Sequence, residues 1–109
     1  MGARDYYGCA TLEKEELLEL ETDIDHQISV EYYRTEQIKY NKFNMARKMY
    51  GIEVIKKDYS NKQVPYIERH VSQFLTKDIE KAENILNLLK INKVMPVHVD
   101  EIIQDLKQM

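Results

Sequence analysis

Histidine and cysteine are the side chains with which this 109-residue chain could build a metal site or a nucleophile. The three histidines, His26, His70 and His98, fall in three different predicted elements, and none has a second His or Cys three or four residues away. Metal motifs need that close spacing, because two ligands on one element must reach the same ion. The single Cys9 rules out an internal disulfide and has no nearby His to activate it. We therefore predict neither a metal site nor covalent catalysis.

Phosphate cradles and acid–base pairs are also missing from the sequence. Gly2, Gly8 and Gly51 are too scattered to form a P-loop or a dinucleotide-binding fingerprint. Carboxylate pairs such as Asp23 and Asp25 lie in a strongly charged stretch, where nothing apolar would raise a carboxyl pKa. The sequence therefore predicts a protein that is not an enzyme and that uses no cofactor.

An acidic amphipathic helix is expected at the N-terminus, capped by Thr11 and running to about Gln27. A helix this acidic has little tendency to persist alone, so its aliphatic face must pack on something. The partner surface is either this chain's own sheet or another chain, and the sequence leaves both open. The aliphatic side chains follow helical spacing at Leu17, Leu20, Ile24 and Ile28.

The hydrophobic period switches to two at Ile28, which predicts strands. Three sequential strands joined by short turns should form an antiparallel meander, at about residues 28–40, 50–57 and 64–71. The alternation places Tyr33 on the opposite face of the sheet from Tyr32. Three tyrosines are expected to face the covering helices: Tyr32, Tyr50 and Tyr66.

Two C-terminal helices complete the predicted fold. Thr76 is a plausible cap for the first, which should end near Ile91, and Pro96 suits the first position of the second. We expect an α+β fold with a three-stranded antiparallel sheet, packed on one face by this helical hairpin. Residues 1–27 would form an N-terminal arm and helix, and residues 28–109 a small domain. The last helix does not suit DNA reading, because phosphates would repel Asp100, Glu101 and Asp105.

Three stretches carry a recognisable pattern: Tyr32-Tyr33, Tyr50–Lys57, and Asn92–His98 continuing through Asp105-Leu106. Together they resemble a family of small Firmicutes proteins known as a domain of unknown function. The resemblance covers about residues 28–108, and its most specific part is the C-terminal Asn-Lys-Val-x-Pro-x-His stretch. Family members often have Thr where this chain has Met95. The resemblance implies a cytoplasmic bacterial protein and carries no known active site.

Charge is distributed unevenly along the chain. The net charge is −6 over residues 1–27, +4 over residues 28–69 and −1 over residues 70–109. A basic middle between acidic ends indicates either a binding surface or charge complementarity between the N-terminal helix and the sheet. The sequence leaves both interpretations open.

The segment from Tyr40 to Tyr50 combines aromatic, basic and amide side chains. That composition suits stacking on bases and pairing with phosphates, and equally suits a protein interface. The simplest alternative is a hairpin connection that tucks Phe43 and Met45 under the sheet. The candidate binding residues are Tyr33, Tyr40, Lys42, Phe43, Arg47 and Lys48, together with Leu17, Leu20 and Ile24 of the N-terminal helix.

The function most consistent with these features is a non-catalytic binding module. We expect it to regulate or inhibit a larger bacterial protein, a role that a chain encoded on a mobile element can fill. Its partner would be that protein or a second copy of the chain. The alternative is a nucleic-acid-binding domain that uses residues 40–50. Neither a signal peptide nor an apolar stretch long enough to span a membrane is evident, so a cytoplasmic location is expected.

Overall fold

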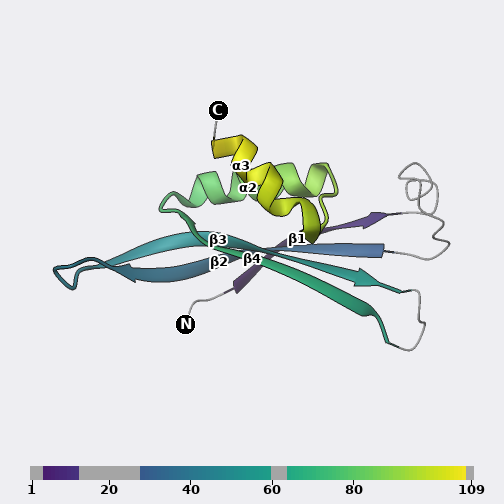
Figure 1. The fold of residues 1–109 in the computed structure, drawn as a ribbon, viewed down its shortest axis with the longest axis horizontal. Helices are drawn as coiled ribbons and strands as arrows, with labels where there is room; N and C mark the ends of the chain where they lie inside the picture. Colours follow the sequence, from purple (N-terminus) through teal and green to yellow (C-terminus); the bar gives the residue numbers. More distant parts are fainter. Residues whose placement is uncertain (1–3, 13–27, 60–63, 108–109) are drawn as a thin grey trace.

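The computed structural model describes residues 4–12, 28–59 and 64–107. Their strands form one antiparallel sheet in the order β1-β2-β3-β4, and both α-helices lie on the same face of it (Figure 1). The elements are β1 (Arg4–Leu12), β2 (Ile28–Tyr40), β3 (Ala46–Asp58), β4 (Tyr66–Thr76), α2 (Ile79–Ile91), the 3-10 helix η1 (Pro96–His98) and α3 (Val99–Lys107).

The predicted three-stranded sheet is wrong, because β1 adds a fourth strand; the α+β class holds. β1 pairs antiparallel with β2, and Thr11, predicted to cap an N-terminal helix, lies within this strand. A bulge between Tyr6 and Gly8 interrupts the period-two pattern. Gly8 and Ala10 occupy helix-facing positions with very small side chains, which further weakens the strand signal. These two features hid β1 from sequence reasoning.

The hydrophobic core lies between the sheet and the helices. Alternate residues of β2 point toward the helices, and Val30 and Tyr32 are fully buried. The neighbouring strand β3 buries Ile52 and Val54 on the same face. The helices contribute Ala82, Leu86, Leu89, Val99 and Ile103. Tyr66 departs from the prediction, since its side chain is 63% exposed.

Local hydrogen bonds define the ends of the helices. The carboxylate of Asp78, rather than Thr76, caps α2 by accepting the Glu80 N–H at 3.0 Å. The helix ends at Ile91 and Asn92 is its C-cap, in agreement with the prediction. Tyr32 donates its hydroxyl hydrogen to the Val94 carbonyl at 2.9 Å, which ties the connection after α2 to the centre of the sheet.

The pairing of β3 with β4 is irregular near the end of β4. Tyr50 pairs with Thr76, whereas Ile52 pairs with Ser72, so β4 carries extra residues between these points. Phe74 lies in this bulge with φ 56°, in the left-handed region that a bulky residue adopts only at a cost. The bulge directs the end of β4 toward α2 and toward the base of the β2–β3 hairpin.

Candidate binding surface on the hairpin between β2 and β3

The far ends of β2 and β3 form a two-stranded hairpin that projects beyond the helices (Figure 1). The described part of β1 pairs with β2 only as far as Thr35, and β4 pairs with β3 only from Tyr50 onward. In the described part of the chain, residues 36–49 therefore pair only with each other. Such a hairpin has little independent stability, so the sheet must hold it at its base.

Asn41 organises the turn at the tip. Its side-chain Oδ1 accepts hydrogen bonds from the backbone N–H groups of Phe43 at 2.9 Å and Met45 at 3.0 Å. Its own N–H donates to the Met45 carbonyl at 3.1 Å, which closes the hairpin. Asn44 takes a left-handed conformation with φ 62°, which asparagine tolerates better than most residues. The asparagines of this segment are thus explained by the turn.

Large apolar side chains are exposed along the hairpin. Ile38 is 55% exposed, Tyr40 61%, Phe43 72% and Met45 64%. Phe43 and Met45 therefore do not tuck under the sheet, which removes the simplest alternative considered for this segment. Exposed apolar clusters of this kind mark interaction sites more often than single exposed residues do.

The two faces of the hairpin carry basic groups in different electrostatic settings. Lys39 and Arg47 are direct cross-strand partners, so their side chains share one face. Lys48, the next residue along, points to the opposite face, where its amine lies 3.8 Å from Glu36. Lys48 therefore has a carboxylate partner, whereas the Lys39 and Arg47 face lacks one among the described residues.

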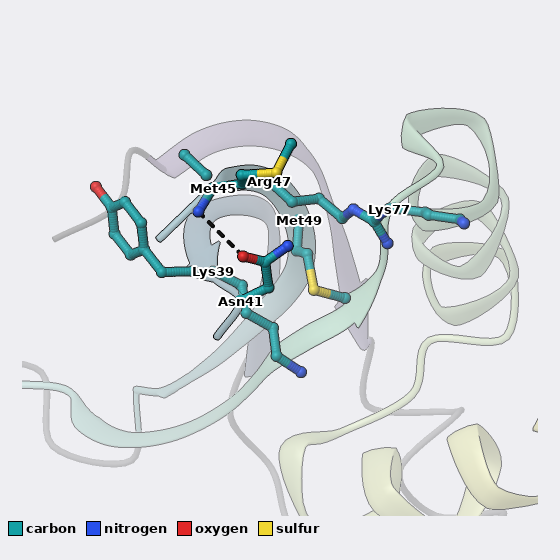
Figure 2. A pocket seen from close by; sticks show the side chains of 8 residues that line it. Lys39, Asn41, Met45, Arg47, Met49 and Lys77 are labelled. Carbon is teal, nitrogen blue, oxygen red and sulfur yellow. Dashed lines mark hydrogen bonds between the residues drawn. The ribbon is translucent and has the colours of Figure 1, made fainter. Parts of the chain in front are cut away.

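A cleft of about 330 Å³ lies along the Lys39 and Arg47 face (Figure 2). Met45 and Met49 of the hairpin line it, and Lys77 reaches it from the connection between β4 and α2. Its charged lining residues are all basic. The complete lining is Lys39, Tyr40, Asn41, Met45, Ala46, Arg47, Met49 and Lys77.

Tyr33 lies elsewhere, in a polar network on the sheet face that the helices leave open. Its ring lies 4.3 Å from the Arg4 guanidinium, and its hydroxyl donates to Glu31 at 2.9 Å. Arg4 also donates to Glu53 at 2.6 Å, and Arg69 lies 3.1 Å from the other oxygen of the same carboxylate. Tyr33 precedes Tyr40 by roughly 23 Å of extended strand. The structure thus separates it from the hairpin residues.

Hydrogen bonds to Glu31 contribute to raised pKa values of two groups in this network, Tyr33 and Lys57. Burial, followed by the bond to Glu31, raises the pKa of the Tyr33 phenol above its ordinary value. The hydrogen bond that Lys57 donates to Glu31 at 3.1 Å raises the pKa of that amine. Both groups keep their protons at neutral pH. The hydrogen bonds of Tyr33 and Lys57 to Glu31 therefore tie β2 to β3 on the open face of the sheet.

The structure brings only part of the predicted set together. Tyr40 and Arg47 line the cleft, while Lys42 and Phe43 sit at the turn with the lysine amine 5.2 Å from the ring centre. Lys48 lies on the other face of the hairpin. Leu17, Leu20 and Ile24 lie outside the described residues.

Two residues that line the cleft, Lys39 and Lys77, lie outside the segment from Tyr40 to Tyr50 that the sequence singled out. The strand register carried a signal for Lys39, because a turn at residues 41–45 places it opposite Arg47. No sequence signal pointed to Lys77, since its position depends on the bulge in β4.

His70 and His98 have ordinary structural surroundings, and His26 lies outside the described residues. The His70 ring nitrogen lies 3.0 Å from the Ser72 hydroxyl and 2.9 Å from the Asp100 carboxylate, linking β4 to α3. His98 lies 4.0 Å from Glu101 at the surface. Within the described ranges, no group of three or more His, Cys, Asp or Glu side chains is arranged to hold a metal ion. No helix in those ranges is long and apolar enough to cross a membrane.

Comparisons with known proteins place the chain in a family. No curated protein and no solved structure matches it. One family model, described as a family of unknown function, matches residues 11–109. That match includes the Asn92–His98 stretch and begins before residue 28, where the resemblance noted in the sequence was expected to start. Because the match spans most of the chain, the protein belongs to the family of unknown function DUF6514.

Proposed function

We propose that this chain is a non-catalytic, cytoplasmic protein-binding module that regulates or inhibits a larger bacterial protein, and that the β2–β3 hairpin is its contact surface. The observation that carries this proposal is the exposure of four large apolar side chains on the hairpin. Their exposed fractions lie between 55% and 72%, at Ile38, Tyr40, Phe43 and Met45. Aromatic, methionine and arginine side chains are enriched in protein interfaces, and this segment contains all three kinds.

The hairpin is also dispensable for the hydrophobic core, which supports a role outside folding. The buried apolar residues of β2 are Ile28, Val30 and Tyr32, and those of β3 are Ile52, Val54 and Ile55. None of them belongs to the hairpin segment 36–49. Apolar side chains displayed beyond the core favour aggregation unless another molecule covers them. A partner protein supplies that cover.

An affinity pull-down tests the proposal. The wild-type chain would be compared with a tip variant carrying Tyr40→Ser and Phe43→Ser, using an extract of the source organism. The control carries Ile91→Ser and Val97→Ser, which removes two exposed apolar side chains outside the hairpin. We expect a partner that the wild type and control retain and the tip variant loses.

Two results contradict this proposal. If the wild-type chain captures nothing above background, the module has no protein partner under these conditions and the function fails. If all three proteins capture the same partner equally, the hairpin is not the contact surface. Circular dichroism and thermal unfolding of each variant ensure that a lost partner reflects a lost surface and not a lost fold.

Nucleic-acid binding is the second candidate function, and the charge of the hairpin favours it. Residues 38–49 contain four basic side chains and no acidic one. Binding through phosphates must weaken steeply as salt rises, because neutralised phosphates release counterions. A fluorescence titration with a single-stranded oligonucleotide at low and moderate salt tests it. Saturable, salt-sensitive binding that Phe43→Ser weakens supports this candidate, and no binding at micromolar protein rejects it.

A further inference from the structure

Three cationic side chains, Lys39, Arg47 and Lys77, line the hairpin cleft, and the lining includes no acidic residue. Lys39 and Arg47 are direct cross-strand partners on one face, an arrangement that costs stability when the two charges are alike. Lys77 comes from the turn after β4 and lines the same cleft. Among the described residues, none of these three forms an ion pair. An anion that binds in the cleft would neutralise part of this repulsion.

Several other basic side chains of the sheet have carboxylate partners, in contrast to those of the cleft. Arg34 contacts Asp5 at 2.7 Å and Glu83 at 2.9 Å. Lys57 contacts Glu31 at 3.1 Å, and Lys56 contacts Glu68 at 3.5 Å. The sheet thus pairs cations with carboxylates at several positions outside the cleft. Three unpaired cations in one concave place are an exception to that pattern.

The side-chain amide of Asn41 also favours an anion in the cleft. The backbone N–H groups of Phe43 and Met45 both donate to the Oδ1 of Asn41, which fixes the orientation of its side-chain amide. Its Nδ2 group therefore remains a donor, and Figure 2 shows it directed toward the side of the cleft where Arg47 and Met49 lie. The cleft thus combines three cations with an amide donor, and lacks a carboxylate that would repel an anionic ligand.

We infer that this cleft binds a carboxylate-rich segment of the partner protein, with acidic side chains on Lys39, Arg47 and Lys77 and apolar side chains on Met45 and Met49. This inference rests on the proposed function and names the chemistry of the partner. The volume of about 330 Å³ is large enough for several side chains and too small for a folded domain. The bound part of the partner is therefore an exposed peptide segment.

The lining favours an acidic peptide over a phosphate backbone. Flexible, polarisable methionines adapt to apolar side chains, and surfaces rich in them bind protein segments. The chain as a whole has a net charge of −3, which repels a long polyanion beyond the local contact. A short acidic segment with interspersed aliphatic residues satisfies both the cations and the methionines.

Fluorescence anisotropy with a labelled synthetic peptide of alternating Glu and Leu blocks tests the inference. We expect saturable binding to the wild-type chain that weakens about three- to tenfold in Arg47→Gln and in Lys39→Gln. The matched control is Lys48→Gln, which removes the same charge from the next residue on the opposite face and should leave binding unchanged. The same peptide with Gln in place of every Glu should not bind.

Thermal unfolding supplies a second readout that does not depend on the label. Removing one of two opposed like charges relieves repulsion, so Lys39→Gln and Arg47→Gln should unfold at the same or a slightly higher temperature than the wild type. The acidic peptide should raise the unfolding temperature of the wild type more than that of either variant. A variant that unfolds at a clearly lower temperature would instead give its residue a structural role.

Three outcomes overturn the inference. The first is that the acidic peptide does not bind, and the second is that Lys48→Gln weakens binding as much as Arg47→Gln. The third is that an oligonucleotide or inorganic phosphate binds the cleft more tightly than the peptide, which makes it a phosphate site. Adding Arg47→Gln to the affinity pull-down separates a failure of this inference from a failure of the proposed function. If Arg47→Gln retains a partner that the Tyr40→Ser and Phe43→Ser variant loses, the protein-binding function stands and the acidic-peptide site does not.

Discussion

Gln37 of β2 and Phe74 of β4 are joined by a hydrogen bond although strand β3 lies between them. The Phe74 N–H donates to Gln37 Oε1 at 3.1 Å, and Gln37 Nε2 donates to the Thr35 hydroxyl at 2.7 Å. Both side chains on β2 are 7% exposed and lie on the face that the helices leave open. They reach β4 at the level of Gly51 of β3, where the absence of a side chain lets the strands approach. This bond ties the bulge of β4, where Phe74 has its left-handed conformation, to β2.

Gly51→Ala should therefore destabilise the protein. A methyl group there would lie 2.2 Å from the Ser72 carbonyl oxygen and 2.8 Å from the Thr35 hydroxyl. Relieving that overlap requires movement of backbone, and overpacking of this kind costs about 1–3 kcal/mol. The control is Gly8→Ala, which meets only the flexible Lys90 side chain at 3.1 Å and should cost less. Urea unfolding of both variants measures the difference, and equal losses would contradict the close approach at Gly51.

Glu53→Gln should weaken the open face of the sheet. The carboxylate is 6% exposed and pairs with Arg4 and Arg69, so the neutral amide loses both ion pairs. Since both arginines can regain water, we expect a loss of about 1–2 kcal/mol. Glu68→Gln is the comparison, because its 37% exposed carboxylate lies 3.5 Å from Lys56 and should cost under about 1 kcal/mol. Denaturant unfolding in which Glu68→Gln costs more than Glu53→Gln would reverse this ranking.

Leu86→Ala should remove a large part of the folding free energy. Leu86 is fully buried between α2 and the sheet, and losing a buried leucine costs about 2–5 kcal/mol. Leu88 lies two residues further along the same helix and is 43% exposed, so Leu88→Ala should cost much less. Thermal unfolding of the two variants compares the two faces of α2. Similar melting temperatures would show that α2 does not pack as described.

Tyr32 should make stability depend on alkaline pH. Burial raises the pKa of its phenol well above the ordinary value of about 10 that it has in the unfolded chain. A raised folded-state pKa favours the folded protein while the phenol keeps its proton. This contribution is complete below about pH 10 and is lost as pH rises from there through the folded-state pKa, because the unfolded chain ionises first.

Tyr32→Phe separates this effect from that of the other tyrosines. At neutral pH the variant should lose about 1 kcal/mol with the hydrogen bond to the Val94 carbonyl. Above about pH 10 its unfolding free energy should fall less steeply than that of the wild type. Chemical denaturation across this pH range measures both slopes. Parallel curves for the two proteins would contradict a buried, protonated Tyr32.

The elements predicted well from sequence are those with an unbroken period. The alternation that begins at Ile28 extends to Tyr40 as expected, and the apolar face of α2 ends at Ile91 before Asn92. The strand predicted at residues 50–57 begins earlier, at Ala46, and the two other strands that were missed or shifted, β1 and β4, carry bulges. The irregularity at Tyr7 hid β1, and the bulge at Phe74 let β4 continue to Thr76, which the sequence had suggested as a helix cap. Bulges change the face to which side chains point, and a periodicity argument reads that change as the end of a strand.

The sequence could predict which segment forms the candidate site, but not which of its side chains share one face. Aromatic and basic residues between Tyr40 and Tyr50 pointed to the hairpin, and their types needed no structure. Which of the basic residues share a face depends on the register, which places Lys39 beside Arg47 and turns Lys48 toward Glu36. Lys77 lies far from these residues in the sequence, and only the folded structure places it beside the cleft.

The projecting hairpin also sets how this chain can change over evolutionary time. Residues 38–49 share no position with the buried core, so substitutions at the tip and in the cleft are screened mainly by what they contact and little by folding. Related chains can therefore acquire new contact preferences there without compensating changes beneath the helices. Hairpin sequences should diverge among family members independently of the packing at Tyr32 and Leu86.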